Sequence, residues 1–283
     1  MTVLEVIQRS TEFLAGKGVD SPRLQAELLL AHCLQLPRMH LYLKFDRVLA
    51  PAELDGFREL VKRRGRREPL QHIVGSTSFC GLEISVNPQV LIPRPETELL
   101  AELGWQFLNG LTPVPVTAVD FGTGSGCIAI ALAAKCSSAQ VAALDISPEA
   151  LVVAKQNALR HGVAERLQFY QGDGLDALPR EIRFHLVIGN PPYIPSAEID
   201  HLQTEVREHD PRGALDGGPD GLAYYRRLAL EAGAFLEPNG KVMLEFGDGQ
   251  AQPVCDLFEA QKWIVEQVVE DYTPRERILI ARR

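Results

Sequence analysis

The stretch that decides the fold is Val116-Thr117-Ala118-Val119-Asp120-Phe121-Gly122-Thr123-Gly124-Ser125-Gly126. Its first six residues are mostly apolar or β-branched, as in a buried strand. The alternate glycines that follow allow a sharp turn and a close approach of the backbone to a ligand. An apolar segment beginning at Cys127 then has the composition of a helix. The sequence therefore predicts a strand, a glycine-rich loop and a helix in succession.

From Val116 onward, segments with strand and helix patterns alternate along the chain. This order predicts an α/β fold, a Rossmann-like, mostly parallel sheet with helices on both faces. Two apolar runs joined by a short turn end the chain, and they predict a C-terminal antiparallel hairpin. The expected strands are 116–121, 139–145, 166–171, 184–189, 240–246, 263–271 and 276–282, and the expected helices are 126–135, 148–161, 221–236 and 249–261.

The part of the chain before this region has a different pattern. Residues 1–70 predict a small helical bundle, with helices over 2–15, after Ser21-Pro22, where the serine is the expected cap, and after Ala50-Pro51. Residues 71–92 predict a β-hairpin connector, and residues 93–283 form the expected catalytic domain. A length of 283 residues is sufficient for two domains.

Charge and composition exclude several classes of protein. The formal charge is +2 over residues 1–90 and −10 over residues 91–283, a poor match for a DNA phosphate backbone. The five cysteines and seven histidines show neither metal-type nor disulfide-type spacing, so we expect reduced cysteines and no metal site. No apolar run could span a bilayer or serve as a signal peptide. We expect a cytoplasmic protein that binds a small molecule or a protein, without direct DNA binding.

The glycine-rich loop indicates a nucleotide-type ligand. Its G-x-G-x-G spacing differs from the G-x-G-x-x-G of dinucleotide loops, and no lysine follows as in a Walker loop. The side chains of Thr123 and Ser125 offer hydroxyl groups. The expected cofactor contacts in this loop are Gly122, Thr123, Gly124, Ser125 and Gly126.

Three residues after the next two strands extend this site. Asp145 ends the second strand, 19 residues after Gly126, where a carboxylate can accept both hydroxyls of a ribose. The alternative, a helix N-cap, suits Ser147 better than Asp145. Asp173 follows the third strand and is placed to bond an adenine amino group, and Gly174 allows a close approach. These positions predict an adenosine pocket.

Asn190-Pro191-Pro192-Tyr193 follows the apolar strand 184–189. Proline has no backbone N–H, so two prolines cannot continue the ladder of that strand. The segment then presents a side-chain amide, free carbonyls and an aromatic ring where open α/β sheets bind their ligands. Such a set can receive a planar –NH2 group, with oxygens for its hydrogens and Tyr193 on its face. Alone, these residues would favour an ordinary turn; their place after a strand, downstream of the glycine loop, favours a receptor.

The loop and the tetrapeptide together resemble class I methyltransferases that use S-adenosyl-L-methionine. The chain further resembles, over nearly its whole length, the peptide chain release factor glutamine methyltransferases (the PrmC/HemK family). The stretches that carry this resemblance are Pro93–Glu98, Asp120–Gly126, Asn190–Tyr193, Asp210–Leu215 and Asp220–Leu222. Two positions depart from that family: Asp210, where glutamate is commoner, and Gly174, where a larger residue often packs against adenine.

The resemblance implies a substrate and a set of catalytic residues. The substrate would be the glutamine of the Gly-Gly-Gln loop of bacterial class I release factors, methylated at N5 to modulate translation termination, with S-adenosyl-L-homocysteine as by-product. Asn190, Pro191 and Tyr193 would act on the amide, Pro192 would complete the substrate site, and Asn190 would also contact the cofactor. We expect no dedicated catalytic base and a monomeric enzyme.

Several alternatives stay open at this point. A DNA adenine-N6 methyltransferase would use the same pocket but needs a basic cleft, and a non-catalytic cofactor-binding or rRNA-associated protein would not need the tetrapeptide. The basic run Lys62–Arg67 is either a helix-terminal charge run that complements the dipole or a docking patch for an acidic partner. The long polar loop 194–220 has no clear secondary structure, and we expect it to order over bound substrate.

Overall fold

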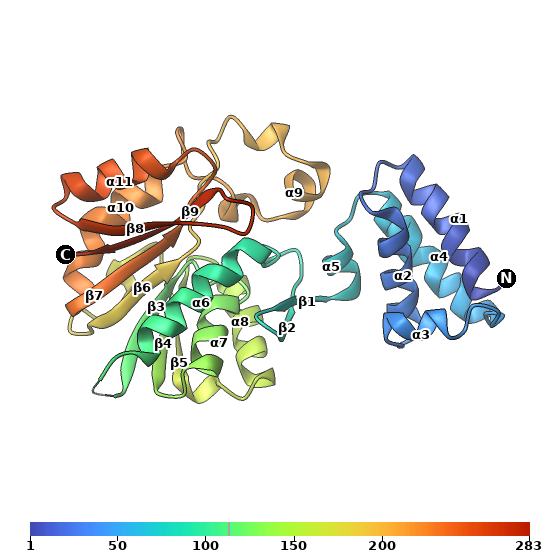
Figure 1. Cartoon of the computed structure of the whole chain (residues 1–283), viewed down its shortest axis with the longest axis horizontal. Coiled ribbons are helices and arrows are strands. Elements are labelled where there is room, and N and C mark those ends of the chain that lie inside the picture. Colours follow the sequence, from blue (N-terminus) through green and yellow to red (C-terminus); the bar gives the residue numbers. More distant parts are fainter. Residues whose placement is uncertain (113) are drawn as a thin grey trace. The chain divides into compact units, whose positions relative to one another are not determined.

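The computed structural model describes residues 1–112 and 114–283 (Figure 1). The chain forms two compact units, one of Met1–Ser76 with Gln203–His209 and one of Thr77–Leu202 with Asp210–Arg283. Across the described ranges, no helix is long and apolar enough to cross a bilayer.

The first unit is helical. Its elements are α1 (Val3–Gly16), α2 (Pro22–Cys33), α3 (Arg38–Tyr42), α4 (Pro51–Gly65), α5 (Leu70–Val74) and α9 (Thr204–His209). Apolar faces of α1 to α5 meet in one core, in which Leu14, Leu29 and Phe57 are almost completely buried. Thr2 and Glu5 form a capping box at the start of α1, which satisfies two backbone N–H groups there. The prediction of three longer helices is confirmed, and α3 and α5 were not predicted.

Ser21 does not cap α2 in the predicted way. Its backbone is in the left-handed region, with φ 47° and ψ 50°, and its side chain accepts no hydrogen bond from the helix. An N-cap side chain reaches the helix N–H groups from an extended backbone, which Ser21 does not have. The predicted serine cap is therefore wrong, although Pro22 does occupy the first turn.

The second unit contains a seven-stranded sheet in the order β5-β4-β3-β6-β7-β9-β8. Its strands are β3 (Val116–Phe121), β4 (Ala139–Asp145), β5 (Leu167–Gln171), β6 (Phe184–Gly189), β7 (Leu236–Glu245), β8 (Ile264–Glu270) and β9 (Glu276–Arg282). Strands β3 to β7 run parallel, and β9 runs antiparallel to both β7 and β8. The predicted mostly parallel sheet with a C-terminal antiparallel hairpin is confirmed. Strand β7 begins earlier than predicted because its first residues pair with β6 across an irregularity in register.

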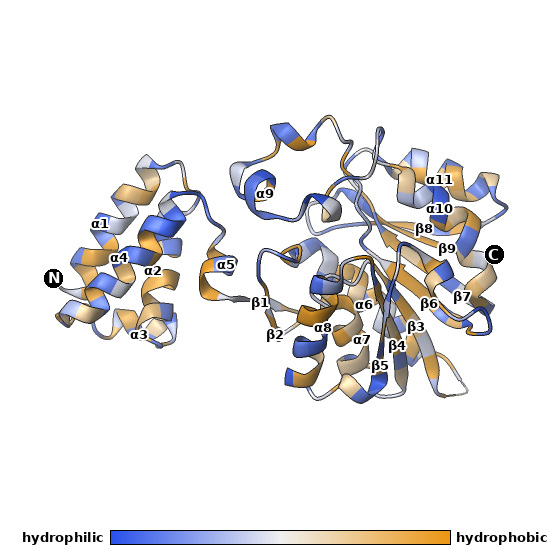
Figure 2. Cartoon of the chain, turned by 180° about the vertical axis from the view of Figure 1, so that it is seen from behind, coloured by the Kyte–Doolittle hydropathy of each residue, from blue (hydrophilic) through white to orange (hydrophobic). Residues whose placement is uncertain are grey.

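Helices cover both faces of this sheet. Figure 1 shows α6 (Pro95–Asn109), α7 (Cys127–Lys135) and α8 (Pro148–Arg160) on one face and α10 (Ala223–Glu231) and α11 (Ala251–Ala260) on the other. Successive strand residues enter opposite cores, for example Ala118 with α6 to α8 and Val119 with α10 and α11. The strands are consequently apolar on both sides, as Figure 2 shows.

A hairpin of β1 (Ser76–Phe79) and β2 (Leu82–Ser85) precedes the sheet. Phe79 lies in the core formed with α6 to α8. The buried amide of Asn157 in α8 accepts a hydrogen bond from the Ser85 N–H at 2.9 Å and donates to the carbonyls of Ser85 and Ser125 at 3.0 and 2.9 Å. One side chain therefore links the hairpin to the glycine-rich loop.

The predicted absence of secondary structure in residues 194–220 is wrong. This segment contains α9 and two short 3-10 turns, η3 (Ile199–His201) and η4 (Arg212–Ala214). Its ends pair with each other, since the N–H of Ile194 bonds the carbonyl of Leu215 and the N–H of Gly217 bonds the carbonyl of Ile194. The helices are short and α9 buries none of its residues, so they leave no apolar periodicity in the sequence.

Candidate functional site

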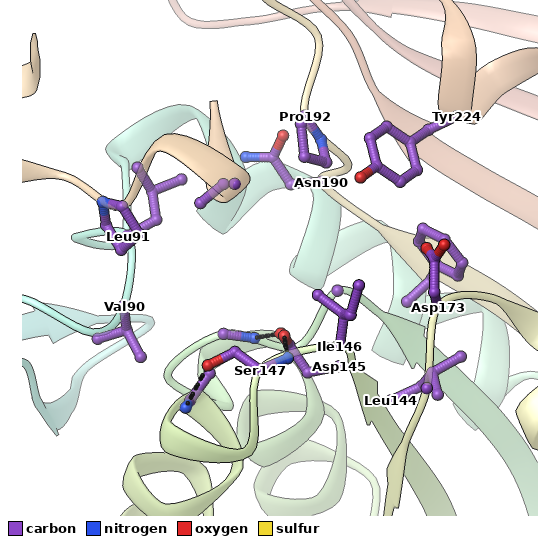
Figure 3. Close-up of a pocket in the computed structure, with 18 of the residues that line it drawn as sticks. Val90, Leu91, Leu144, Asp145, Ile146, Ser147, Asp173, Asn190, Pro192 and Tyr224 are labelled. Atoms are coloured by element: carbon purple, nitrogen blue, oxygen red, sulfur yellow. Dashed lines mark hydrogen bonds between the residues drawn. The ribbon is translucent and has the colours of Figure 1, made fainter. Parts of the chain in front are cut away.

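A pocket of about 200 Å³ lies in the second unit, where β3, β4, β5 and β6 end (Figure 3). Parallel sheets bind their ligands at this edge. The structure brings together seven of the residues that sequence analysis selected, namely Gly122, Gly124, Asp145, Asp173, Gly174, Asn190 and Pro192. Among the described residues, no three His, Cys, Asp or Glu side chains gather as a metal site.

The glycine-rich loop turns the chain sharply between β3 and α7. Gly122, Gly124 and Gly126 have φ values of 72°, 54° and 82°, which favour glycine over residues with a Cβ. Gly122 and Gly124 line the pocket. A Cβ on Gly126 would instead lie 3.1 Å from Ala154, so this glycine serves the packing of α7 against α8.

The hydroxyl of Thr123 is directed to Asp120 instead of to a ligand. Its Oγ1 donates to Asp120 Oδ2 at 2.6 Å, and the N–H of Ala129 donates to the same oxygen at 3.1 Å. Asp120 is fully buried, and this burial raises its pKa to about 7. Ser125 is also buried and does not line the pocket. These two hydroxyls, selected as cofactor contacts, therefore belong to the inner side of the loop.

Backbone N–H groups hold both carboxylate oxygens of Asp145 in place. One oxygen accepts the Gly124 N–H at 2.8 Å and the other accepts the Ser147 N–H at 2.9 Å. Burial raises the pKa of this carboxyl. Ser147 caps α8 by accepting the N–H of Ala150, so the alternative role of N-cap belongs to Ser147 and not to Asp145. Figure 3 shows Asp145 and Ser147 across the pocket from Asn190 and Pro192.

Arg227 of α10 packs against Gly174 and Asp173. Its Nη1 lies 3.0 Å from Asp173 Oδ1, and the Asp173 side chain is 62% exposed. Gly174 has a φ of 129°, and a Cβ there would lie 1.9 Å from Arg227 Nη2. The guanidinium therefore fills the space that a larger residue at position 174 would need. Sequence analysis did not identify Arg227.

The tetrapeptide is divided between the pocket and the core. Asn190 and Pro192 line the pocket, whereas Pro191 and Tyr193 do not. Tyr193 packs against the core formed with α10 and α11, and burial raises the pKa of its phenol to about 12. The amide nitrogen of Asn190 donates to Thr97 Oγ1 at 3.2 Å and to Glu245 Oε1 at 3.0 Å. The amide oxygen is the polar atom left for a ligand.

The sequence analysis missed one residue of the pocket and one ion pair outside it. Tyr224 of α10 lines the pocket, with its ring edge-to-face to Phe121 at 6.2 Å. Arg94 pairs with the buried carboxylate of Asp210 at 2.7 Å, which joins the stretch 93–98 to the stretch 210–215. The position of Tyr224 at the start of a helix carried no signal, but the charges at Arg94 and Asp210 could have suggested a pair.

Comparisons with known proteins show which family the chain resembles. Residues 5–75 match the family described as PrmC N-terminal domain, and residues 106–207 match the methyltransferase small domain. A release factor glutamine methyltransferase of Geobacter sulfurreducens is 45% identical over 269 residues, 92% of each chain. Proteins of the same name from Nitratidesulfovibrio vulgaris and Moorella thermoacetica are 42% identical, covering 100% of this chain and 95% and 99% of theirs.

Solved structures support the fold of the second unit. A methyltransferase from Pyrococcus furiosus has a TM-score of 0.52 at 20% identity and covers 71% of this chain and 88% of its own. A ribosomal protein L11 methylase from Lactobacillus delbrueckii has a TM-score of 0.50, also at 20% identity, with 71% and 84% covered. At this level of identity the likeness concerns the fold alone.

Proposed function

Since the chain belongs to the family of release factor glutamine methyltransferases, we propose that it methylates the side-chain N5 of the glutamine in the Gly-Gly-Gln motif of class I release factors. The observation that carries this proposal is Asn190, whose amide –NH2 is engaged internally while its oxygen remains for a ligand at the pocket. An acceptor oxygen suits a substrate that presents N–H groups, as a glutamine amide does.

The residues of the pocket fit an adenosine-type methyl donor. The Asp145 carboxylate is available for ribose hydroxyls, Asp173 for the adenine amino group, and the backbone is open at Gly122 and Gly124. When bound, S-adenosyl-L-methionine supplies a methyl group that is already activated by a positively charged sulfur. The chain then has to hold the acceptor in line with this group, and orientation of this kind can lower a barrier by several kcal/mol, about 7 in favourable cases.

Asn190 and Pro191 would activate the acceptor by accepting its hydrogens. An amide nitrogen is a poor nucleophile because its lone pair is delocalised into the carbonyl. Hydrogen bonds from its N–H groups to the Asn190 oxygen and the Pro191 carbonyl would localise that pair and aim it at the methyl group. Because Tyr193 packs in the core, we assign it the role of holding the tetrapeptide, with Pro192 as the wall beside the amide. The proton leaves to solvent, without a dedicated base.

We further propose a division of labour between the parts of the chain. Residues 1–70 would dock the release factor, residues 71–92 would connect, and residues 93–283 would carry out the transfer, in a cytoplasmic monomer. The separate family match over residues 5–75 supports a distinct role for the helical part.

The test is methyl transfer from labelled S-adenosyl-L-methionine to three acceptors: an intact class I release factor, the same factor with its Gly-Gly-Gln glutamine replaced, and adenine-containing DNA. We expect label on the intact factor alone. For Asn190→Ala we expect a roughly 100-fold or larger fall in kcat. Label on DNA, or equal label on the replaced factor, would contradict the proposal.

A further inference from the structure

Three side chains from separate elements form a closed hydrogen-bonded network behind Asn190. Glu245 ends β7 and is 2% exposed, and Thr97 lies in the first turn of α6 and is 3% exposed. Thr97 Oγ1 donates to Glu245 Oε2 at 2.7 Å. Asn190 Nδ2 donates to Glu245 Oε1 at 3.0 Å and to Thr97 Oγ1 at 3.2 Å. Neither Thr97 nor Glu245 lines the pocket.

The hydrogens in this network determine the orientation of the Asn190 amide. Asn190 has two N–H hydrogens and two acceptors for them, and the single hydroxyl hydrogen of Thr97 goes to Glu245. A reversed amide would place its oxygen against the carboxylate of Glu245, and both groups accept. The charge on Glu245 therefore strongly favours the arrangement in which the –NH2 faces inward and the oxygen is left for a ligand.

We propose that Glu245 is a positioning residue for the methyl acceptor: with Thr97 it holds the Asn190 amide so that its oxygen receives the N–H of the substrate. This inference rests on the proposed function and deepens it. Glu245 acts through Asn190 and contacts neither substrate nor donor. Without it the amide could rotate and present –NH2, which cannot accept a hydrogen bond from another –NH2 group.

Placing a carboxylate in the core is costly, and this cost couples the network to pH. Burial raises the pKa of Glu245 to about 7, and Glu96 raises it further, while the hydrogen bonds of Thr97 and Asn190 and the charge of Arg277 oppose this. The phenol of Tyr193 also faces this carboxylate, and Tyr225 Oη donates to the Glu245 backbone carbonyl at 2.7 Å. Above this pKa both side-chain oxygens accept. Below it one oxygen carries a proton, so it becomes a donor and the orientation of Asn190 is no longer enforced.

The test uses the full chain with two substitutions at Glu245, assayed on a release factor from about pH 5.5 to pH 9. In Glu245→Gln the carboxamide has one acceptor and one donor, as the protonated carboxyl has, so both the titration and the enforced orientation of Asn190 are lost. We expect its kcat to stay roughly at the low value that wild type reaches at about pH 5.5, without the rise of kcat that wild type shows as the pH increases. In Glu245→Leu we expect a roughly 100-fold fall in kcat, with the Kd for S-adenosyl-L-methionine and the KM for the factor within about threefold.

Glu270→Gln, the same substitution at an exposed strand end, is the matched control and should behave as wild type. If Glu245→Leu fails to fold, the pH profile of Glu245→Gln decides. Suppose that wild type is active and that its fall in kcat at acidic pH is equally present in Glu245→Gln. That result, or a normal kcat in Glu245→Leu, would overturn the positioning role alone. A wild type that labels no release factor would instead overturn the proposed function, and this inference with it.

Discussion

At the scale of single residues, the carboxylates of the pocket should differ in importance. Asp145 is partly buried and held by two backbone N–H groups, whereas Asp173 is 62% exposed and already paired with Arg227. A fixed, poorly solvated acceptor loses less on binding and gains more from each hydrogen bond. We expect Asp145→Ala to raise the Kd for S-adenosyl-L-methionine roughly 10- to 100-fold and Asp173→Ala to raise it by less than about fivefold.

Isothermal titration calorimetry on the two variants measures this difference, and Asp176→Ala is a suitable control because Asp176 is exposed and also pairs with Arg227. Equal losses at positions 145 and 173 would contradict the assignment of Asp145 as the main polar anchor of the donor.

Single residues also show where sequence analysis stops. Asn190 and Asp145 were found because each ends an apolar strand beside a recognisable loop. Glu245 ends a strand as well, but a carboxylate after Val242-Met243-Leu244 has the pattern of any strand reaching solvent. Its partner Thr97 is 148 residues away along the chain, and only the fold brings the two together. Likewise, the hydroxyl of Thr123 suggested a ligand contact until its bond to Asp120 was seen.

At the scale of elements, the basic run at the end of α4 has a structural role in the helical unit. Arg64 is 4% exposed and lies 2.7 Å from Glu205 of α9, and Arg67 lies 2.6 Å from the same carboxylate. Arg63 and Lys62 pair with Glu68 and Glu59. Arg64 and Arg67 therefore hold α9. Because all four cations already have partners within the unit, they are poorly available as a docking patch.

We therefore expect Glu205→Ala to destabilise this unit by about 2 kcal/mol, since it leaves the buried Arg64 without its carboxylate. Burial by itself would raise the pKa of Glu205, but hydrogen bonds from Arg67 and Arg64 lower it to about 2. Because this pKa is lowered, the ion pairs of Glu205 contribute fully to folding stability above the ordinary pKa of 4.5. Their contribution is lost as the pH falls toward 2.

Urea unfolding followed by circular dichroism at neutral and acidic pH measures this effect. Glu208→Ala is the matched control, because Glu208 is half exposed and pairs with an exposed arginine at the surface. A Glu205→Ala variant as stable as Glu208→Ala at neutral pH would show that the pair contributes nothing.

The bounds of helices and strands could be predicted where the local sequence alone determines where an element begins and ends. The bounds of β3, β4 and β6 match their predictions because each is an apolar run that ends at glycine, asparagine or a charged residue. Helices α3 and α5 are only five residues long and offer less than two turns of periodicity. Within residues 194–220 the helical turns are stabilised by contacts such as Glu205 with Arg64, which local sequence does not reveal.

At the scale of the whole molecule, two buried carboxyls should make stability depend on pH. Asp120 and Glu245 each have a pKa raised by burial to about 7, from 3.8 and 4.5. A raised pKa means that the folded state binds the proton more tightly than the unfolded chain. The two carboxyls therefore increase the free energy of unfolding at acidic pH, and this increase is lost as the pH rises through about 7. We expect each group to lower stability by about 1 kcal/mol between pH 6 and pH 8.

Thermal unfolding of the full chain at these pH values measures this dependence, with a lower Tm expected at pH 8. Glu245→Gln should remove about half of the difference, because one of the two titrating groups is then absent. A Tm that rises from pH 6 to pH 8, or a slope unchanged in Glu245→Gln, would argue against ionisation of these carboxyls near pH 7.

The central claim for the molecule is that the Asn190 oxygen holds a glutamine amide for methylation. The most direct measurement is mass spectrometry of the peptide that contains the Gly-Gly-Gln motif, after treatment of an unmodified release factor with the enzyme and S-adenosyl-L-methionine. We expect one methyl group on the glutamine side chain with wild type and almost none with Asn190→Ala, while the variant still binds the donor. A methyl group on any other residue, or undiminished methylation by Asn190→Ala, would contradict the claim.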